Sequence, residues 1–188
     1  VEDLLVDRAF HAERRSSGIE LATTADLAHL APGGRAENLP AHLLADALAA
    51  AALARAAGAD PEAVAAGLRA YSPGAHRIVT VAEAGGVTWV DDSKATNPHS
   101  AEAALTSLPQ GTGVWICGGD TKGAHFFDLV RTARPHLRGV VVVGKDQRDI
   151  LAALEQEAPG LPVTRVGDGT AEQVSTAAVE AAGAMARS

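Results

Sequence analysis

The sequence predicts an α/β fold whose second part carries a mostly parallel sheet. Beyond residue 74, short apolar segments alternate with segments of helix-forming residues, a pattern typical of parallel strands joined by right-handed helical crossovers. One of these segments, Val140–Val143, is apolar at every position, as expected for a strand covered by helices on both faces. Hydrophobic residues make up 47% of the 188 residues, which is enough to build a core.

The first part of the chain is predicted to hold two short strands and a long helix. Val1–Val6 and Ile19–Ala22 have the composition of strands but no evident partners, so we expect the chain to start in the middle of a sheet. Asp26–Leu30 could form a single helical turn, before Pro32-Gly33-Gly34 breaks the chain. His42–Ala57 is the clearest helix, and its scarcity of polar residues predicts burial over most of its surface.

A further helix precedes the expected domain boundary. It should begin with Asp60 as its N-cap and Pro61 in its first position, and run to about Tyr71. Ser72-Pro73-Gly74 then ends it. We place the boundary here, so that residues 1–73 are the end of an incomplete domain. Residues 74–188 form a second domain that lacks its last segment, because an α/β domain is expected to continue with a strand after a helix.

The elements of the second domain follow from hydrophobic periodicity and from the glycines and prolines between them. Gly85-Gly86 favours a hairpin turn between the first two strands. We expect strands at residues 77–82, 87–90, 113–117, 140–143 and 162–166, and helices at residues 98–108, 126–136, 147–157 and 170–186.

Composition excludes several classes of function. A net charge of −7 and an aromatic content of 3% argue against a nucleic-acid partner, because phosphate-neutralising charge and stacking rings are both scarce. A single cysteine, Cys117, allows neither an intrachain disulfide nor a cysteine-rich zinc site. No apolar stretch approaches the roughly 20 residues that span a bilayer, and no signal peptide is visible, so we expect a cytoplasmic protein without a membrane partner.

Polar side chains are concentrated in Val87–Ser100, where a strand runs into a loop and then into a helix. The carboxyl end of a strand is where open α/β sheets bind ligands. Asn97 and Pro98 are suited to start the helix, whose free N–H groups and dipole favour an anion. Lys94 adds a mobile positive charge, and Asp92 suits a ribose hydroxyl, an ammonium group or a metal ion. Taken alone, the segment is equally well explained as an ordinary capped connection.

A second polar loop, Gly118–Gly123, follows the next strand. Its spacing matches neither a Walker phosphate loop nor a dinucleotide-binding fingerprint. Its lysine, Lys122, could hold a substrate carboxylate, although a plain glycine-rich turn explains the pattern as well. Arg77, at the domain boundary, could reach a ligand or clamp the hinge. The seven histidines show no His-x-x-x-His pair, so we expect no histidine metal site.

In combination, three motifs resemble those of the Mur ligases. They are His76-Arg77, then Asp91-Asp92-Ser93-Lys94-Ala95-Thr96-Asn97-Pro98, then Gly118-Gly119-Asp120-Thr121-Lys122-Gly123-Ala124. The second motif is the specific one, and it looks most like the D-glutamate-adding members of the family. The helix segment Ala47–Ala50, preceded by His42, resembles the end of the family's central ATPase domain. The resemblance therefore covers nearly the whole chain.

The resemblance implies that residues 1–73 end a central α/β ATP-binding domain, and that residues 74–188 form a Rossmann-like, amino-acid-binding C-terminal domain. Enzymes of this family use ATP and Mg²⁺ to activate a carboxylate as an acyl phosphate, and an amine then displaces phosphate. The implied function is addition of D-glutamate to UDP-N-acetylmuramoyl-L-alanine in peptidoglycan precursor synthesis, by a monomer whose partners are these small substrates and ATP.

The resemblance also assigns roles to single residues. Nucleotide contacts fall on Arg77, Asp92 and Asp46, the catalytic position near the transferred phosphate on Lys94, and D-glutamate contacts on Thr96 and Lys122. These roles suit a reaction that depends on positioning and charge stabilisation. Three positions depart from the family pattern, which has Asn at Leu43 and Asp46 and often Asp at His125. An ionised aspartate at position 46 has no N–H to donate to adenine.

Several alternatives remain open from the sequence. The chain could come from another Mur ligase, or from a folylpolyglutamate synthetase-like ligase with a different amino acid. It could also be a non-catalytic module that binds a nucleotide or an amino acid. Because the phosphate loop and most magnesium ligands are expected upstream, we expect the 188 residues alone to be inactive.

Overall fold

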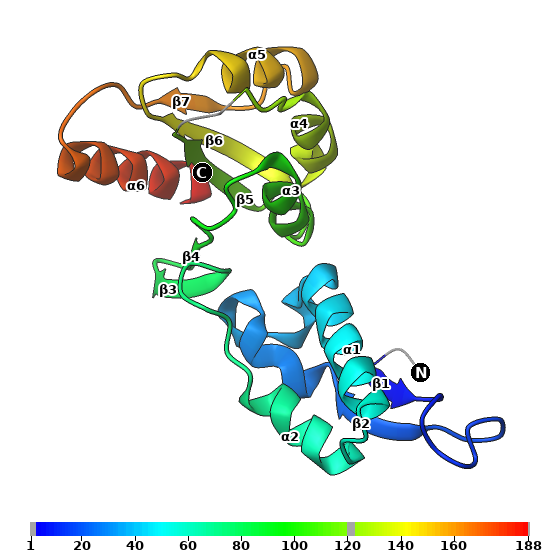
Figure 1. Ribbon diagram of the computed structural model, residues 1–188. Helices are drawn as coiled ribbons and strands as arrows, with labels where there is room; N and C mark the ends of the chain where they lie inside the picture. Colours follow the sequence, from blue (N-terminus) through cyan, green and yellow to red (C-terminus); the bar gives the residue numbers. More distant parts are fainter. Residues whose placement is uncertain (1–2, 120–122, 188) are drawn as a thin grey trace. The chain divides into compact units, whose positions relative to one another are not determined.

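The computed structural model describes residues 3–119 and 123–187, which form two compact units (Figure 1). The first unit comprises Val1–Ala82 and Thr88–Asp92, and the second comprises Glu83–Val87 and Ser93–Ser188. Each unit has its own cluster of buried hydrophobic residues. The domain boundary expected between residues 73 and 74 remains a prediction.

The first unit begins with a pair of antiparallel strands, β1 (Leu4–Asp7) and β2 (Ile19–Thr23). The expectation that these strands lack partners is therefore wrong, because they pair with each other. Their register shifts between Leu5 and Val6, where a bulge interrupts the ladder. The long loop between the strands concealed this pairing in the sequence, since it has none of the short turns that mark a tight hairpin.

Short helical turns follow the strands and lead into two α-helices. The expected turn is confirmed as η1 (Ala25–Leu30), and two more 3₁₀ turns follow it, η2 (Pro32–Gly34) and η3 (Ala36–Asn38). The predicted helices are confirmed as α1 (Ala41–Ala56) and α2 (Pro61–Ala70). Asp60 precedes α2 in extended conformation, but its side chain makes no capping hydrogen bond. Pro61 does occupy the start of the helix, as its fixed φ favours.

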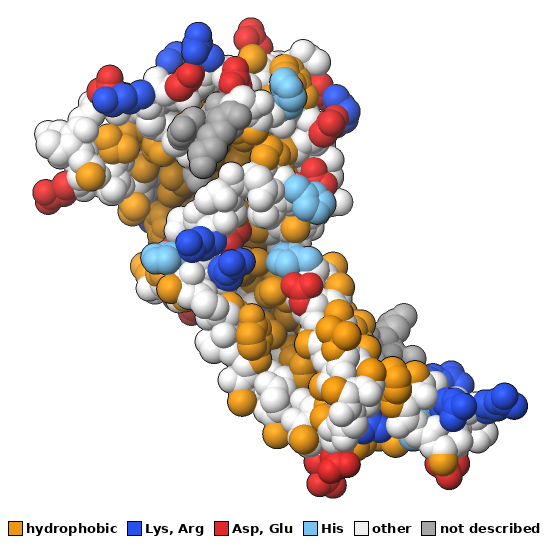
Figure 2. Space-filling model, in the orientation of Figure 1, with side chains coloured by type: hydrophobic (Ala, Val, Ile, Leu, Met, Phe, Trp, Pro, Cys, Tyr) orange, Lys and Arg blue, Asp and Glu red, His pale blue; other side chains and the backbone are white. Residues whose placement is uncertain are grey.

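Helix α1 is less buried than its sequence indicates. Its buried residues are Ala47 and Ala51, whereas Leu48 is 44% exposed and Leu53 is 73% exposed. Hydrophobic side chains accordingly gather on the visible surface of the first unit (Figure 2). The prediction of burial on most of the helix surface is wrong here, because within this unit α1 packs Ala47 and Ala51, with Leu43 and Leu44 partly buried beside them, against the core and leaves Leu48 and Leu53 outside.

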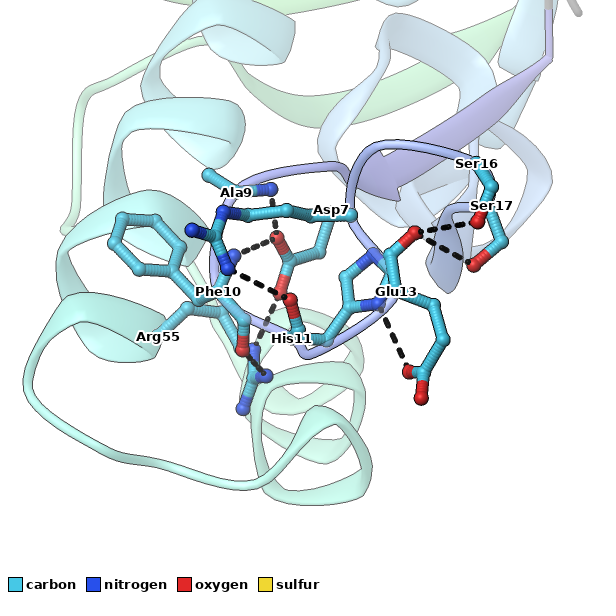
Figure 3. A network of polar contacts seen from close by, with 9 residues as sticks. Asp7, Ala9, Phe10, His11, Glu13, Ser16, Ser17 and Arg55 are labelled. Atoms are coloured by element: carbon cyan, nitrogen blue, oxygen red, sulfur yellow. Dashed lines mark hydrogen bonds and ion pairs between the residues drawn. The ribbon is translucent and has the colours of Figure 1, made fainter.

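An ion pair ties the β1–β2 loop to the end of α1 (Figure 3). The Asp7 side chain is buried, and its Oδ2 accepts a hydrogen bond from Arg55 Nε at 2.8 Å. Asp7 Oδ1 accepts from the backbone N–H groups of Ala9 and Phe10, at 2.8 and 2.9 Å. The arginine also donates to the Phe10 carbonyl at 2.7 Å and to the Ala59 carbonyl. The hydrogen bond from Arg55 and those from the loop lower the Asp7 pKa to about 2.

We expect Asp7→Asn to destabilise the first unit in a pH-dependent way. The native pKa of about 2 lies below the ordinary value of 3.8, so the carboxylate stabilises the fold fully above pH 3.8. This contribution is lost as the pH falls toward about 2. Urea titrations across this range should show a difference between wild type and variant that shrinks on acidification. Asp146→Asn is the control, because its pair with Arg148 is exposed and contributes little. Equal stability of wild type and Asp7→Asn at neutral pH would contradict the prediction.

The second unit is built on a parallel sheet in the order β5-β6-β7. The strands are β5 (Gly113–Gly118), β6 (Leu137–Val143) and β7 (Val163–Arg165). The central strand β6 is the most deeply buried, with Val140, Val141 and Val142 at 0% exposure. The predicted α/β class with a parallel sheet is thus confirmed.

Helices cover both faces of this sheet, as the apolar β6 predicts (Figure 1). Val140 and Val142 pack into a cluster with residues of three helices. The intervening positions face α6, where a side chain at Gly139 would meet the Met185 sulfur at 2.7 Å. The helices are α3 (Pro98–Thr106), α4 (Phe127–Ala133) with the 3₁₀ turn η4 (Arg134–His136), α5 (Arg148–Glu157) and α6 (Ala171–Arg187).

The predicted hairpin is confirmed as β3 (Val79–Ala84) and β4 (Val87–Asp91). Gly85 and Gly86 both have positive φ, at 59° and 77°, the combination that a two-residue hairpin turn of type I′ requires. The hairpin forms a two-stranded sheet distinct from β5-β6-β7. The strand that leads into Asp92 therefore does not end at the edge of an open parallel sheet, contrary to the expectation from the sequence.

Candidate functional site

The loop after β4 leads directly into a capped helix. Asn97 has extended backbone angles, and its Oδ1 accepts a hydrogen bond from Ser100 N–H at 2.9 Å, so it caps α3 as predicted. Within the loop, Thr96 N–H donates to the Lys94 carbonyl at 2.8 Å, which forms a tight turn. The side chains of Lys94 and Thr96 are exposed in the second unit. A ligand approaching this loop would meet one ammonium group and one hydroxyl.

Asp92 stands in a more closed environment on the first unit. Its Oδ1 accepts a hydrogen bond from Ile78 N–H at 3.2 Å. Partial burial raises the Asp92 pKa, and the charge of Asp91 acts in the same direction. The hydrogen bond from Ile78 and the charges of His42 and Arg77 oppose that rise. The structure therefore brings two predicted nucleotide-binding residues, Arg77 and Asp92, within electrostatic range of each other.

The third predicted nucleotide-binding residue, Asp46, lies on α1. It follows His42 by four residues, so the two side chains occupy the same face of the helix. The charge of His42 is one of those that lower the pKa of Asp92. The Asp46 side chain is exposed, which leaves its carboxylate accessible.

The glycine-rich loop begins where β5 ends. A Cβ at Gly118 would overlap the Val143 carbonyl oxygen and lie 2.7 Å from its carbonyl carbon. At Gly144, which follows β6, a Cβ would lie 3.1 Å from Gly119 N. The backbone after β5 and the backbone after β6 are thus in close contact at the carboxyl edge of the sheet. Lys122 lies outside the described residues, and the exposed His125 follows it.

Gln147 makes hydrogen bonds to several segments at this edge of the sheet. From the sequence it is predicted only to start a helix. It is 7% exposed, and its Nε2 donates to the Gly144 and Val166 carbonyls, both at 2.9 Å. Its Oε1 accepts from Arg165 Nε at 3.1 Å. One side chain therefore ties the ends of β6 and β7 together. A polar residue before an amphipathic helix carries no sequence signal for such long-range contacts.

We expect Gln147→Leu to destabilise the second unit by about 2 kcal/mol, because a buried carbonyl group at Val166 and a partly buried one at Gly144 lose their donor. The free energy of unfolding from urea titrations would measure the loss. Gln156→Leu on the exposed side of α5 is the matched control, for which we expect almost no change. Similar losses in both variants would contradict the role assigned to Gln147.

Residues 3–119 and 123–187 contain neither a metal-binding cluster nor a membrane-spanning helix. No three His, Cys, Asp or Glu side chains there are grouped so as to hold a metal ion. No helix in those ranges is long and apolar enough to cross a membrane. The Cys117 thiol is mostly enclosed, and burial raises its pKa, so it stays in the protonated form that a structural cysteine has.

Comparison with known proteins identifies similar chains. The family described as "Mur ligase, glutamate ligase domain" matches residues 76–188. The chain is 49% identical over 185 residues to a UDP-N-acetylmuramoylalanine--D-glutamate ligase of Thermobifida fusca, which covers 97% of the chain. Proteins of the same name from Streptomyces avermitilis and Streptomyces coelicolor are 48% and 46% identical, over 99% and 100% of the chain. The chain spans 37% of the length of each of these relatives.

Proposed function

The chain belongs to the Mur ligase family, and from this premise we propose that it is the C-terminal part of an ATP-dependent ligase that adds D-glutamate to UDP-N-acetylmuramoyl-L-alanine. The observation that carries the proposal is the near-complete coverage of the chain by relatives that bear the name of a D-glutamate ligase. The reaction serves peptidoglycan precursor synthesis. The cytoplasmic location and the monomeric state expected from the sequence remain predictions.

The loop between β4 and α3 supports the chemistry of the proposal. Lys94 carries a positive charge on an exposed, flexible stem, and in our proposal it lies near the phosphoryl group that is transferred. Thr96, two residues further on, offers a hydroxyl to D-glutamate. The tight turn between them holds the two residues at a fixed spacing. We assign the second D-glutamate contact to Lys122.

The nucleotide contacts of the proposal come from the first unit. Arg77 has an exposed guanidinium, which suits a phosphate or a base. Asp92 can accept a ribose hydroxyl, although one of its oxygens already accepts the Ile78 N–H. Asp46 lies on the same face of α1 as His42 and would approach the base as an acceptor only. ATP supplies the phosphoryl group that activates the substrate carboxylate.

Among the described residues, no three His, Cys, Asp or Glu side chains are grouped so as to hold a metal ion such as the Mg²⁺ that the family uses. In the proposal the ion is held by residues elsewhere in the complete ligase, and ATP-dependent activity belongs to that complete protein. We expect the 188 residues alone to release no phosphate.

The experiment that tests the proposal is phosphate release by the complete ligase carrying this chain. Release should require ATP, UDP-N-acetylmuramoyl-L-alanine and D-glutamate together, and a product larger than the acceptor by one glutamate should appear in mass spectrometry. Release with L-lysine or diaminopimelate in place of D-glutamate would overturn the amino-acid assignment. No release with any of these amino acids would overturn the ligase itself and leave a non-catalytic binding module.

A further inference from the structure

The backbone around Arg77 adopts an unusual conformation. Within residues 3–119 and 123–187, the non-glycine residues with positive φ are His76, at 66°, and Ile78, at 53°. They stand on either side of Arg77. Positive φ brings a side chain into conflict with its own backbone, and the conflict is most severe for a β-branched residue such as isoleucine. Both residues occupy positions that would favour glycine.

The two acidic residues that follow Val90 hold this segment. Asp91 Oδ2 lies 2.6 Å from His76 Nδ1, and Asp92 Oδ1 accepts the Ile78 N–H at 3.2 Å. The contacts therefore fall on the two strained residues, one before and one after Arg77. They become possible because the β3–β4 hairpin places the residues before β3 beside the residues at the end of β4.

We propose that Asp91 and His76 are positioning residues that fix the backbone of Arg77 so that its guanidinium meets the nucleotide. This inference rests on the proposed nucleotide contact of Arg77. An arginine side chain has many rotamers, and binding immobilises fewer degrees of freedom when its backbone is already fixed. Asp91 and Asp92 then hold the two residues that flank Arg77. Asp91 holds the preceding residue through the His76 side chain, and Asp92 holds the following residue through the Ile78 N–H.

A purely stabilising role explains these contacts less well. The His76 side chain is 57% exposed and that of Asp91 is 29% exposed, and exposed ion pairs contribute little to stability. Glycine at positions 76 and 78 would adopt positive φ without strain, so that no ion pair would be needed to hold the backbone. Strained backbone that is held by neighbouring side chains is typical of functional segments, where the geometry itself is required.

The test uses the complete ligase and compares KM for ATP with kcat. We expect Asp91→Ala to raise KM for ATP by up to about fivefold, the most that loss of one exposed pair predicts, with kcat little changed. Asp91→Asn should recover much of the loss, because its amide oxygen still accepts from an imidazole N–H. His76→Ala should raise KM for ATP as much as Asp91→Ala does. The double variant should have a KM no higher than that of either single variant. Asp128→Ala removes a similar exposed pair on α4 and should leave KM unchanged.

A second measurement reports on the backbone itself in the 188-residue chain. Positive φ brings the N–H and Hα of one residue close together, so His76 and Ile78 should give strong intraresidue NOE signals. We expect Asp91→Ala to weaken the signal of His76. An unchanged His76 signal in Asp91→Ala would overturn the inference, because the pair would then not fix the backbone.

The inference and the proposed function fail in different ways. If Arg77→Ala raises KM for ATP but Asp91→Ala does not, the positioning role is overturned and the nucleotide contact stands. If Arg77→Ala leaves KM unchanged, the nucleotide contact and the positioning role both fall, while phosphate release with D-glutamate still decides the ligase assignment. A fall in kcat at unchanged KM in Asp91→Ala would also overturn the positioning role.

Discussion

Replacing Lys94 by alanine in the complete ligase is expected to lower the rate of phosphate release by about 10²–10³-fold, the loss typical for one preorganised group that stabilises developing charge. The lysine is exposed and lies in a loop stabilised by the Asn97 cap and the Thr96 turn, neither of which uses its side chain. The variant should therefore fold as the wild type does. The loss should appear in kcat, since the charge on the transferred group is greatest in the transition state.

The control for Lys94→Ala is Arg15→Ala, which removes an exposed cation from the β1–β2 loop. We expect this variant to keep full activity. Lys94→Arg should recover only part of the rate, because a planar guanidinium does not replace a compact ammonium group at the same distance. A wild-type kcat in Lys94→Ala would contradict the catalytic role of Lys94. The loop would then be an ordinary connection between a strand and a helix.

Gly118→Ala is expected to produce the largest loss of stability, more than about 3 kcal/mol, because overpacking and backbone strain add. Its φ of 154° disfavours a side chain, and the added Cβ would overlap the Val143 carbonyl oxygen. That oxygen belongs to the backbone at the end of β6, which cannot move without disturbing the sheet core. Urea unfolding of the second unit, followed by the fluorescence of Trp115 on β5, would measure the loss.

Gly119→Ala is the matched control for this variant. Its φ is also positive, at 110°, but none of the residues that the structure describes has an atom within 4 Å of the added Cβ. Its expected cost is therefore conformational strain alone, on the order of 1–2 kcal/mol. Equal losses at the two positions would show that φ, and not the close approach of β5 to the end of β6, explains why glycine is required.

Local patterns were sufficient to predict most elements of the fold. The Asn97 cap, the Pro61 helix start and the Gly85-Gly86 turn were all predicted because each depends on residues only a few positions apart. The run Val140–Val143 predicted a strand with both faces covered, since only such a strand can be apolar at every position. The family, too, was evident from short motifs whose order and spacing are specific.

Local patterns could not predict the long-range contacts. The pairing of β1 with β2, the exposure of Leu53 and the network of Gln147 each depend on residues brought together from distant parts of the chain. Burial and hydrogen bonding are properties of the packed structure, so a composition or a period cannot specify them.

The segment around Arg77 shows this division most clearly. The motifs His76-Arg77 and Asp91-Asp92 predict a candidate nucleotide site through their resemblance to those of the Mur ligases. The contacts between the two motifs and the positive φ of His76 and Ile78 arise only when the β3–β4 hairpin closes. Residue chemistry is encoded locally, whereas the orientation of a functional side chain depends on which distant backbone segments the fold holds beside it.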